Sequence, residues 1–308
     1  MKNKEKKIFI NRKPVIGPWG GGNKTLTGLA EKLSERHNVV YDLDHKDIDV
    51  IFCFDPRPDS AGIWYKDLME YREKFGSKIV QRVGDVGSHG KPDLTSLVYQ
   101  STHNSDFVIF TSDWARKAIS FNNKNYAIIH NSPVPEFFNN RSNRGIEGNV
   151  LKVVTHHWST NQLKGFETYK KLGLLANENN ISFTYIGRYP DEETSEGIET
   201  IGPKDSKYLS EILPNFDVYL TASMYEAGAN HVLEGLASGL PVVYAEGGGS
   251  IPEYVSSYGV EYNDLQGLLL SLDTIRNNYQ LFKSRALGYN SNFDDTIQKY
   301  VDIILCES

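Results

Sequence analysis

The chain has 308 residues, a length typical of about two domains, and 39% of them are hydrophobic, which is enough for buried cores. No window approaches the ~18 consecutive apolar residues of a membrane-spanning helix, and the apolar run at 8–10 is too short for a signal peptide. The two cysteines, Cys53 and Cys306, exclude a disulfide scaffold and a zinc site of four cysteines. We therefore expect a cytoplasmic protein.

Charge is unevenly distributed along the chain. Residues 1–150 carry 22 Lys or Arg against 18 Asp or Glu, whereas residues 151–308 carry 11 against 21, and the formal net charge is −6. Because proteins that bind nucleic acid are usually basic overall, we expect no nucleic-acid partner. The basic N-terminal half is compatible with peripheral contact with anionic lipid headgroups, and equally with an ordinary solvated surface.

In the first half, short apolar runs alternate with amphipathic stretches. The pattern predicts a helix at 25–36 and strands at 7–10, 39–43, 50–54, 79–83, 107–111 and 128–130. Strands that are apolar throughout and separated by helices indicate a parallel sheet covered on both faces. The polar, glycine-containing segment 139–150 is the best candidate for a linker.

The second half repeats this alternation of short apolar runs and amphipathic stretches. Helices are expected at 163–177 and 230–238, and strands at 152–155, 183–186, 217–220 and 241–244. We therefore predict an α/β fold of two successive βα arrays with a cleft between them. The amphipathic stretch 293–305 has no following strand, and the pattern leaves open on which half it docks.

The most informative stretch is 221–255, TASMYEAGANHVLEGLASGLPVVYAEGGGSIPEYV. It begins where a strand ends, the edge at which open α/β sheets bind ligands. Glu226 is expected in the loop, Asn230 at the N-cap of the next helix, and Glu234 on its second turn. The free backbone N–H groups after Glu226 form an anion site suited to a diphosphate.

The end of this stretch adds two local signals. The run Gly247-Gly248-Gly249 lets backbone approach a ligand closely. Ser250 and Glu253 have the spacing of a capping box, which predicts another helix start.

These residues resemble the Glu-x7-Glu motif of retaining nucleotide-sugar glycosyltransferases with the GT-B fold, above all family 4 (group 1). The resemblance rests on Glu226 and Glu234 at the required spacing, on Asn230, and on the continuation through LEGLASGLPVV to the Gly-Gly and Pro-Glu ending. Without this context, two glutamates eight residues apart are ordinary surface or capping residues.

The resemblance implies two Rossmann-like domains facing a central cleft. An acceptor-binding domain is then expected at 1–140 and a nucleotide-sugar donor domain at 151–290, with a terminal helix at 291–308 whose docking side is undetermined.

The resemblance also implies roles on the donor side. The segment VVTHHWSTNQLKGFETY matches the first strand of the family's donor domain, so Lys164 would reach the donor diphosphate and Glu226 would orient the transferred sugar; these are the catalytic candidates. Nucleotide binding would involve Glu234 at the ribose and the loop residues Gly228, Ala229 and Asn230.

One donor-side position departs from the family pattern. Many members have an arginine five residues before the lysine, where this chain has Ser159. His156, His157 or Arg188 are candidates to supply the missing diphosphate contact, and each also has an ordinary structural interpretation.

A glycine-rich loop, IGPWGGGNKT at 16–25, follows the first expected strand. The segment does not match a Walker A loop, because Asn23 separates the glycines from Lys24. It does not match the dinucleotide-binding fingerprint either, because Thr25 occupies the position of the third glycine. In the GT-B fold this loop approaches the donor phosphates, which implies a binding role for Gly20, Gly21 and Gly22. A plain tight turn is the alternative.

The segment QRVGDVGSHG follows another expected strand. Arg82, Asp85 and His89 resemble family residues that contact the acceptor and the transferred sugar, and a solvated loop fits the same pattern.

The resemblance implies transfer of a sugar from a nucleotide-diphosphate donor to an acceptor hydroxyl with retention at the anomeric carbon. The expected mechanism is front-face displacement in which the departing phosphate oxygen takes the acceptor proton. No metal cofactor is expected. The acceptor is expected to be a saccharide or lipid-linked, in surface polysaccharide or glycolipid synthesis, on the cytoplasmic side and peripheral to the inner face of the membrane.

Two other classes remain open at this point. One is a non-catalytic nucleotide-sugar-binding protein of the same fold, supported by the missing arginine and the short chain. The other is an epimerase or phosphorylase on the same architecture, for which the sequence singles out no pyridoxal lysine.

Overall fold

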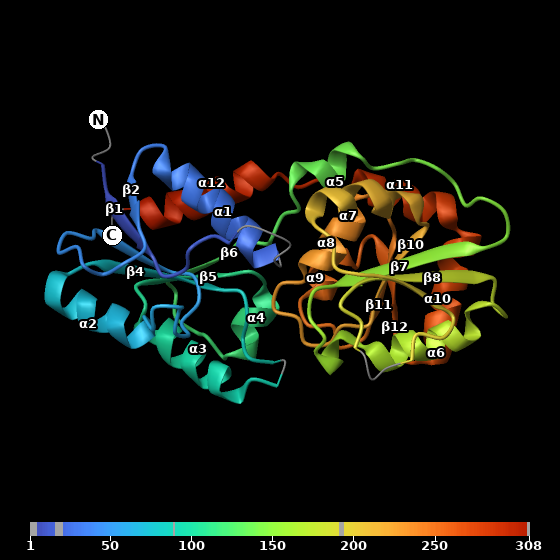
Figure 1. The fold of residues 1–308 in the computed structure, drawn as a ribbon, viewed down its shortest axis with the longest axis horizontal. Helices are drawn as coiled ribbons and strands as arrows, with labels where there is room; N and C mark the ends of the chain where they lie inside the picture. Colours follow the sequence, from blue (N-terminus) through green and yellow to red (C-terminus); the bar gives the residue numbers. More distant parts are fainter. Residues whose placement is uncertain (1–4, 16–20, 89, 191–193, 307–308) are drawn as a thin grey trace. The chain divides into compact units, whose positions relative to one another are not determined.

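The structure is a computed structural model that describes residues 5–15, 21–88, 90–190 and 194–306. The described residues divide into two compact units (Figure 1). Unit 1 contains residues 5–15, 21–131 and 293–306, and unit 2 contains residues 132–292. Among the described residues, the chain passes into unit 2 after residue 131 and returns to unit 1 for its last helix.

Unit 1 is built on a parallel sheet with the strand order β2-β1-β3-β4-β5-β6. Its strands are β1 (Lys7–Ile10), β2 (Asn38–Val40), β3 (Val50–Cys53), β4 (Lys78–Val83), β5 (Phe107–Phe110) and β6 (Tyr126–Ile128). Its helices are α1 (Gly21–Ser34), α2 (Tyr65–Phe75), α3 (Pro92–Asn104), α4 (Asp113–Ala118) and α12 (Phe293–Leu305).

Side chains of each strand alternate between two apolar cores in unit 1. Ile8 and Ile10 pack in a core with α1 and α12, whereas Phe9 points to the other face and packs with α2. This alternation follows from the two-residue period of a strand. Burial on both faces explains why the strands are apolar throughout.

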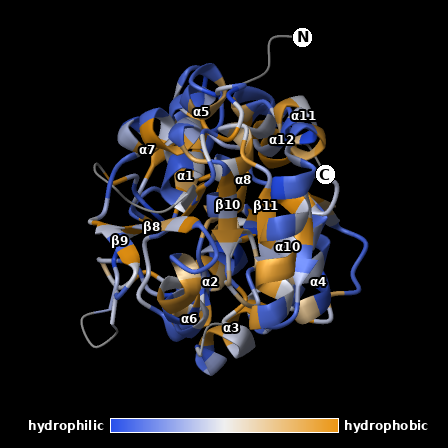
Figure 2. Cartoon of the chain, turned by 90° about the vertical axis from the view of Figure 1, so that its right-hand side faces the viewer, coloured by the Kyte–Doolittle hydropathy of each residue, from blue (hydrophilic) through white to orange (hydrophobic). Residues whose placement is uncertain are grey.

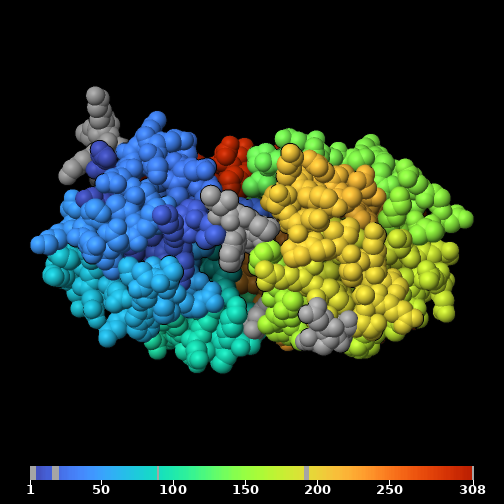
Figure 3. Space-filling view, in the orientation of Figure 1, coloured from blue at the N-terminus to red at the C-terminus, as the bar shows by residue number. Residues whose placement is uncertain are grey.

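The terminal helix α12 packs on α1 in unit 1 (Figure 1). In the space-filling view, red atoms from the end of the chain lie beside blue atoms from its beginning (Figure 3). A Cβ at Gly28 of α1 would lie 2.8 Å from the Phe293 ring, so only glycine allows this close crossing. Tyr300 is fully buried, and the Lys6 ammonium donates to the Leu305 carbonyl at 3.0 Å. The amphipathic stretch at the end of the chain is therefore part of the core of unit 1.

Unit 2 has a second parallel sheet, in the order β12-β11-β10-β7-β8-β9. Its strands are β7 (Leu151–His157), β8 (Ile181–Gly187), β9 (Ile198–Ile201), β10 (Val218–Thr221), β11 (Val242–Ala245) and β12 (Gly259–Tyr262). Its helical segments are α5 (Pro135–Asn139), η1 (Gln162–Lys164), α6 (Phe166–Ala176), α7 (Ser206–Ile212), η2 (Leu213–Asn215), α8 (Asn230–Ala237), α9 (Ile251–Val255), α10 (Leu265–Asn277) and α11 (Tyr279–Gly288).

Helices cover both faces of this sheet as well. One core joins the sheet to α6 and α10, and the other joins it to α7, α8 and α9. Figure 2 shows β10 and β11 in hydrophobic colours at the centre of unit 2. The predicted α/β fold class is therefore confirmed in each unit.

Several predicted elements differ in detail from the structure. The helix expected at 163–177 is interrupted, because Gly165 adopts φ +90° between the short helix η1 and α6. The strand expected at 128–130 lies two residues earlier, at Tyr126–Ile128. Strands β9 and β12 had no counterpart in the prediction. Both are short and carry an exposed glutamate, so their apolar pattern is weak.

Candidate functional site

The loops after β7 and β10 lie next to each other in unit 2. These strands are neighbours in the sheet, but the chain continues from β7 to β8 on one side and from β10 to β11 on the other. Ligands of open α/β sheets bind at such a topological switch point, outside the carboxyl ends of the strands. Lys164 follows β7 and Glu226 follows β10, so both lie in these two loops.

Lys164 and Glu226 form an ion pair in which Nζ donates to Oε1. Their side chains are only 13% and 11% exposed, so the pair is largely removed from water. Backbone contacts hold the two loops together, since the Met224 N–H donates to the Leu163 carbonyl at 2.9 Å. Gly165 allows this contact, because a Cβ there would lie 2.3 Å from that of Ala222. The structure thus brings the two predicted catalytic residues into direct contact.

The backbone at Glu226 is also hydrogen-bonded to the glycine-rich loop after β11. Glu226 forms an isolated parallel bridge with Gly249, and the Ser250 N–H donates to the Glu226 carbonyl at 2.8 Å. Gly249 has φ +74°, and a Cβ there would lie 2.4 Å from that carbonyl oxygen. Tyr225, directly before Glu226, has φ +53°, a strained conformation that is common at functional sites.

Glu234 lies on the second turn of α8 and is held by His156. His156 Nε2 is 2.8 Å from Glu234 Oε2, and His156 Nδ1 is 3.0 Å from the Tyr219 hydroxyl. Because an ionised carboxylate only accepts hydrogen bonds, Nε2 carries the hydrogen and, in the neutral ring, Nδ1 accepts from Tyr219. Burial raises the pKa of Tyr219 well above its ordinary value, which keeps this hydroxyl protonated.

Two further histidines lie beside this group. His157 Nε2 is 2.7 Å from the Tyr169 hydroxyl, and His231 Nε2 is 2.9 Å from Thr221 Oγ1. Burial lowers the pKa of His231 to about 3, so this ring is neutral near pH 7. His156 and His157, which were candidates to replace the missing arginine, therefore both bond to side chains of unit 2.

The start of α8 corrects the predicted cap. The N-cap is Ala229, without a side-chain hydrogen bond, and Asn230 is the first helical residue. The Asn230 N–H donates to the Gly228 carbonyl at 3.0 Å, so the chain already turns before Asn230. The loop residues Gly228, Ala229 and Asn230 nevertheless lead directly from Glu226 into α8.

The capping box expected at Ser250 and Glu253 is wrong. Ser250 is the N-cap of α9, but it has helical φ and ψ of −74° and −9°, whereas a capping side chain requires an extended backbone. Its hydroxyl is buried without a hydrogen-bond partner.

Arg188 follows β8, the strand that pairs with β7. Its guanidinium stacks 4.0 Å above the Trp158 ring, and its side chain is exposed. Within the described residues, no hydrogen bond or ion pair joins Arg188 to Lys164, Glu226 or Glu234.

A second polar cluster occupies the switch point of unit 1, between β1 and β3. Asn11 follows β1, and its side-chain oxygen accepts the Phe54 N–H at 2.7 Å. Asp55 forms an ion pair with Arg57 at 2.6 Å and a second with Arg12 at 3.6 Å. Burial alone would raise the pKa of Asp55, but the Arg57 hydrogen bond and charge hold it below its ordinary value.

Sequence reasoning missed Asn11, Arg12 and Arg57. The signal that could have found them is that each is a polar residue just after a buried strand, at adjacent strands of one sheet.

The predicted acceptor-side residues lie one strand further along. Arg82 is on β4 and buried, and its guanidinium lies 4.7 Å above the Phe54 ring. Asp85 accepts from the Lys91 ammonium and from the Gly87 N–H, each at 2.9 Å.

The predicted glycine loop lies at the start of α1. Gly21 and Gly22 are the first residues of that helix, and Gly22 faces the Phe54 ring. Gly20 and His89 lie outside the described residues.

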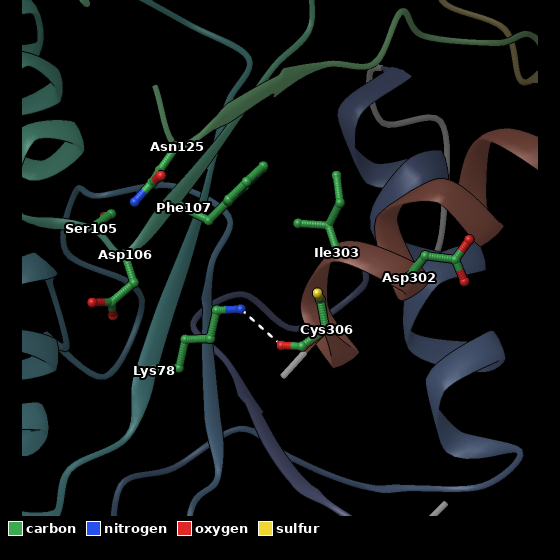
Figure 4. Close-up of a pocket in the computed structure, with 8 residues that line it drawn as sticks. All are labelled: Lys78, Ser105, Asp106, Phe107, Asn125, Asp302, Ile303 and Cys306. Atoms are coloured by element: carbon green, nitrogen blue, oxygen red, sulfur yellow. Dashed lines mark hydrogen bonds between the residues drawn. The ribbon is translucent and has the colours of Figure 1, made fainter. Parts of the chain in front are cut away.

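A cavity of about 710 Å³ in unit 1 lies at the opposite end of the strands (Figure 4). Lys78 and Phe107, the first residues of β4 and β5, line it together with Cys306, whose carbonyl accepts from the Lys78 ammonium at 2.9 Å. This cavity is therefore separate from the carboxyl-end clusters of the sheet.

The described part of the chain lacks two features that would bear on function. It holds no group of three His, Cys, Asp or Glu residues arranged to bind a metal ion. It also holds no helix whose length and apolar character would let it cross a membrane.

Comparison with known families identifies part of unit 2. Residues 162–274 match the family model described as Glycosyl transferases group 1, a range that includes Lys164, Glu226 and Glu234. The chain is therefore a glycosyltransferase that carries a group 1 domain. No curated protein matches the sequence.

Solved structures are similar over nearly the whole chain. HepE of Anabaena in complex with UDP and glucose is 14% identical with a TM-score of 0.68, covering 98% of this chain and 96% of that one. WaaG, a glycosyltransferase involved in lipopolysaccharide biosynthesis, is 13% identical with a TM-score of 0.68 over 97% and 99% of the two chains.

Sucrose-phosphate synthase from Thermosynechococcus elongatus is 15% identical, with a TM-score of 0.66 over 98% and 97%. At these identities the likeness is one of fold, and it confirms the predicted GT-B architecture of two Rossmann-like sheets.

Proposed function

We propose that the protein is a retaining glycosyltransferase, resembling family 4, that transfers a sugar from a nucleoside-diphosphate donor to an acceptor hydroxyl. Unit 2 binds the donor, and unit 1 binds the acceptor. The observation that carries this proposal is the buried Lys164–Glu226 pair at the switch point of unit 2, beside the start of α8. A cation and a carboxylate in adjacent loops match the two parts of the donor, its diphosphate and its sugar.

The pair exchanges partners when the donor binds. The diphosphate takes the place of Glu226 beside Lys164, and the N–H groups at the start of α8 add to the positive field around it. Glu226 is then released to accept hydrogen bonds from the sugar hydroxyls. Glu234, aligned by its hydrogen bond from His156, accepts from the ribose hydroxyls.

Transfer proceeds by front-face displacement. The bond from the anomeric carbon to the diphosphate oxygen breaks, and the acceptor oxygen forms its bond on the same face. The departing phosphate oxygen takes the acceptor proton, so the configuration is retained. Lys164 stabilises the negative charge on the leaving group, which gives the chain a metal-independent means of doing so. Arg188 and the glycines 20–22 are further candidates for the diphosphate.

The acceptor is a saccharide or lipid-linked, and unit 1 meets it with Arg82, Asp85 and His89. The excess of basic residues in 1–150 supports peripheral contact with an anionic membrane surface. WaaG, one of the structural neighbours, is involved in lipopolysaccharide biosynthesis, and HepE was solved with UDP and glucose. We therefore place the protein in cytoplasmic synthesis of a surface polysaccharide or glycolipid, with UDP as the first nucleotide to test.

The test is a thermal-shift titration with UDP, GDP, ADP, TDP and CMP. A ligand at ~100 times its dissociation constant should add about 2.7 kcal/mol of stability. We expect a shift with one nucleoside diphosphate that Glu234→Gln weakens and that Glu211→Gln, at an exposed position on α7, leaves unchanged. No shift with any nucleotide contradicts the proposal.

Catalysis and stereochemistry need a second measurement. Slow donor hydrolysis that disappears in Glu226→Gln excludes the non-catalytic alternative, and NMR of the new glycosidic bond reports retention. Activity that EDTA abolishes would contradict the role given to Lys164. Turnover of the nucleotide sugar to its epimer without an acceptor would support the epimerase alternative instead.

A further inference from the structure

Arg82 is a cation buried at the carboxyl edge of the unit 1 sheet. It is the second-last residue of β4 and only 5% exposed. Its guanidinium lies between the Phe54 ring and the backbone of Gly84, where a Cβ would come within 2.1 Å of Nη1. Phe54 belongs to the loop after β3, so Arg82 borders the switch-point cluster of Asn11 and Asp55.

Most N–H donors of the Arg82 guanidinium have no acceptor among the described residues. A guanidinium has five N–H groups, and only Nη2 donates to an acceptor among the described residues, the side-chain oxygen of Asn131 at 3.3 Å. Nε is sealed from solvent without any partner. A buried donor without an acceptor is costly, and more so when it is charged.

Arg82 also lacks a counter-charge. No carboxylate of the described residues lies within ion-pair distance of it. The two nearest candidates along the same sheet edge have other partners, because Asp55 pairs with Arg57 and Asp85 pairs with Lys91. The first turn of α1, which meets Phe54 through Gly22, has no acidic side chain.

Arg144 in unit 2 shows how the chain normally buries an arginine. Its side chain is 18% exposed, and it pairs at 2.9 Å with Asp217, whose side chain is fully buried. It also donates from Nε to the Pro214 carbonyl at 3.2 Å. A charge taken out of water needs such compensation. Arg82 is more buried than Arg144, and among the described residues it has the Asn131 hydrogen bond and the Phe54 ring but no ion pair.

We propose that Arg82 is the cation of an oxyanion subsite in unit 1 that binds a phosphate or carboxylate group of the acceptor. The planar guanidinium offers paired N–H donors, the geometry that both oxyanions accept. The bound anion supplies the counter-charge and the hydrogen-bond acceptors that the protein does not. The assignment of this anion to the acceptor rests on the proposed function, in which unit 1 is the acceptor side.

The test measures the thermal stability of the full chain with inorganic phosphate, glucuronate and, as a neutral control, glucose. We expect phosphate or glucuronate to raise the Tm of the wild type and glucose to leave it unchanged. Arg82→Met should weaken that response at least tenfold, and Arg82→Lys should retain part of it.

The ligand-free variants separate binding from structure. Because Arg82→Met removes an uncompensated buried charge, we expect its Tm to equal or exceed that of the wild type. Arg144→Met, the matched control, should lower the Tm and leave the phosphate response intact. A Tm that falls in Arg82→Met as far as in Arg144→Met, or a phosphate response independent of Arg82, would overturn the proposal.

A parallel titration with the nucleotides separates the two sources of phosphate. An unchanged nucleoside-diphosphate response in Arg82→Met supports an acceptor group, and a response lost together with that to phosphate overturns the acceptor assignment. If the wild type binds phosphate through Arg82 but no nucleotide at all, the proposed function fails while the anion subsite stands.

Discussion

The carboxyl edges of the two sheets balance their charges in different ways. In unit 2, Lys164 pairs with Glu226 and His156 bonds to Glu234, so each predicted donor-side carboxylate has a partner within the unit. In unit 1, Asp55 is paired with two arginines, whereas Arg82 is buried one strand away with no carboxylate of the described residues at ion-pair distance. In the proposed function the first edge exchanges partners when the donor binds, whereas at the second edge the proposed anion supplies a missing counter-charge.

This difference has a physical consequence for substitutions. Where two charges are paired out of water, removing one leaves the other unpaired and costly. Where a buried cation has no partner, removing it relieves a penalty.

The largest effect is expected at the Lys164–Glu226 pair. Lys164→Met should lower the transfer rate by about 10³-fold, as removal of a charge-stabilising group at the leaving atom does. Glu226 then lies almost buried without its cation, so stability should also fall. Steady-state kinetics and urea unfolding measure the two effects. The double variant Lys164→Met/Glu226→Gln should regain the stability but not the rate, and recovery of both would contradict the proposed roles.

The next effect concerns a paired arginine away from the site. Arg144→Met leaves Asp217 fully buried without its ion pair, and we expect a loss of about 3 kcal/mol in the free energy of unfolding. Burial already raises the pKa of Asp217 because it disfavours the ionised form, and removal of the Arg144 cation should raise it further. Urea unfolding of this variant beside Arg82→Met gives the comparison directly. Equal losses in the two would remove the distinction between the two edges.

A glycine-to-alanine substitution should cost more stability at the unit 2 edge than at the unit 1 edge. Gly249→Ala combines φ +74° with a Cβ 2.4 Å from the Glu226 carbonyl oxygen, so we expect a loss of about 2 kcal/mol and weaker nucleotide binding. Gly90→Ala, in the loop after β4, has φ +70° with no atom within 4 Å and should cost about 1 kcal/mol from strain alone. Thermal unfolding checks both, and an equal cost would show that the contact with Glu226 is unimportant.

The smallest expected effect is a pH dependence of the stability, which arises from the buried His231 in unit 2. The pKa of His231 is lowered to about 3, mainly by burial, while the unfolded chain has the ordinary value of 6.5. Between these values the unfolded state binds more protons, so stability falls as the pH is lowered, by about 1 kcal/mol per unit. His231→Gln should flatten the curve of stability between pH 6.5 and 5. The control His103→Gln, at an exposed position, should leave the curve unchanged.

Much of the local structure could be predicted from the sequence. The apolar runs at 50–54 and 107–111 mark β3 and β5 to within a residue, because strands buried on both faces are apolar throughout. The segment around Glu226 and Glu234 was recognised from the spacing of the two glutamates together with the sequence that surrounds them, from 221 to 255. The match of residues 162–274 to a glycosyltransferase model covers that segment.

The errors have local physical causes. Gly165 reads as an ordinary helix position in sequence, and its φ of +90° is required only because the chain passes against Ala222. Ser250 has the spacing of a capping residue but a helical backbone, so its hydroxyl cannot reach the helix N–H groups. In both cases the deciding contact comes from a segment distant in the chain.

The sequence by itself determined the period of most core strands, the repeated βα units and the motif on which the proposed donor site rests, because these depend on neighbours along the chain. The tertiary structure alone decided which strands are adjacent, and hence that Lys164 meets Glu226 and that His156 reaches Glu234. It alone also showed that Arg82 is buried without a counter-charge. Ion pairing and burial depend on the order of strands in the sheet, which the local pattern of residues does not encode.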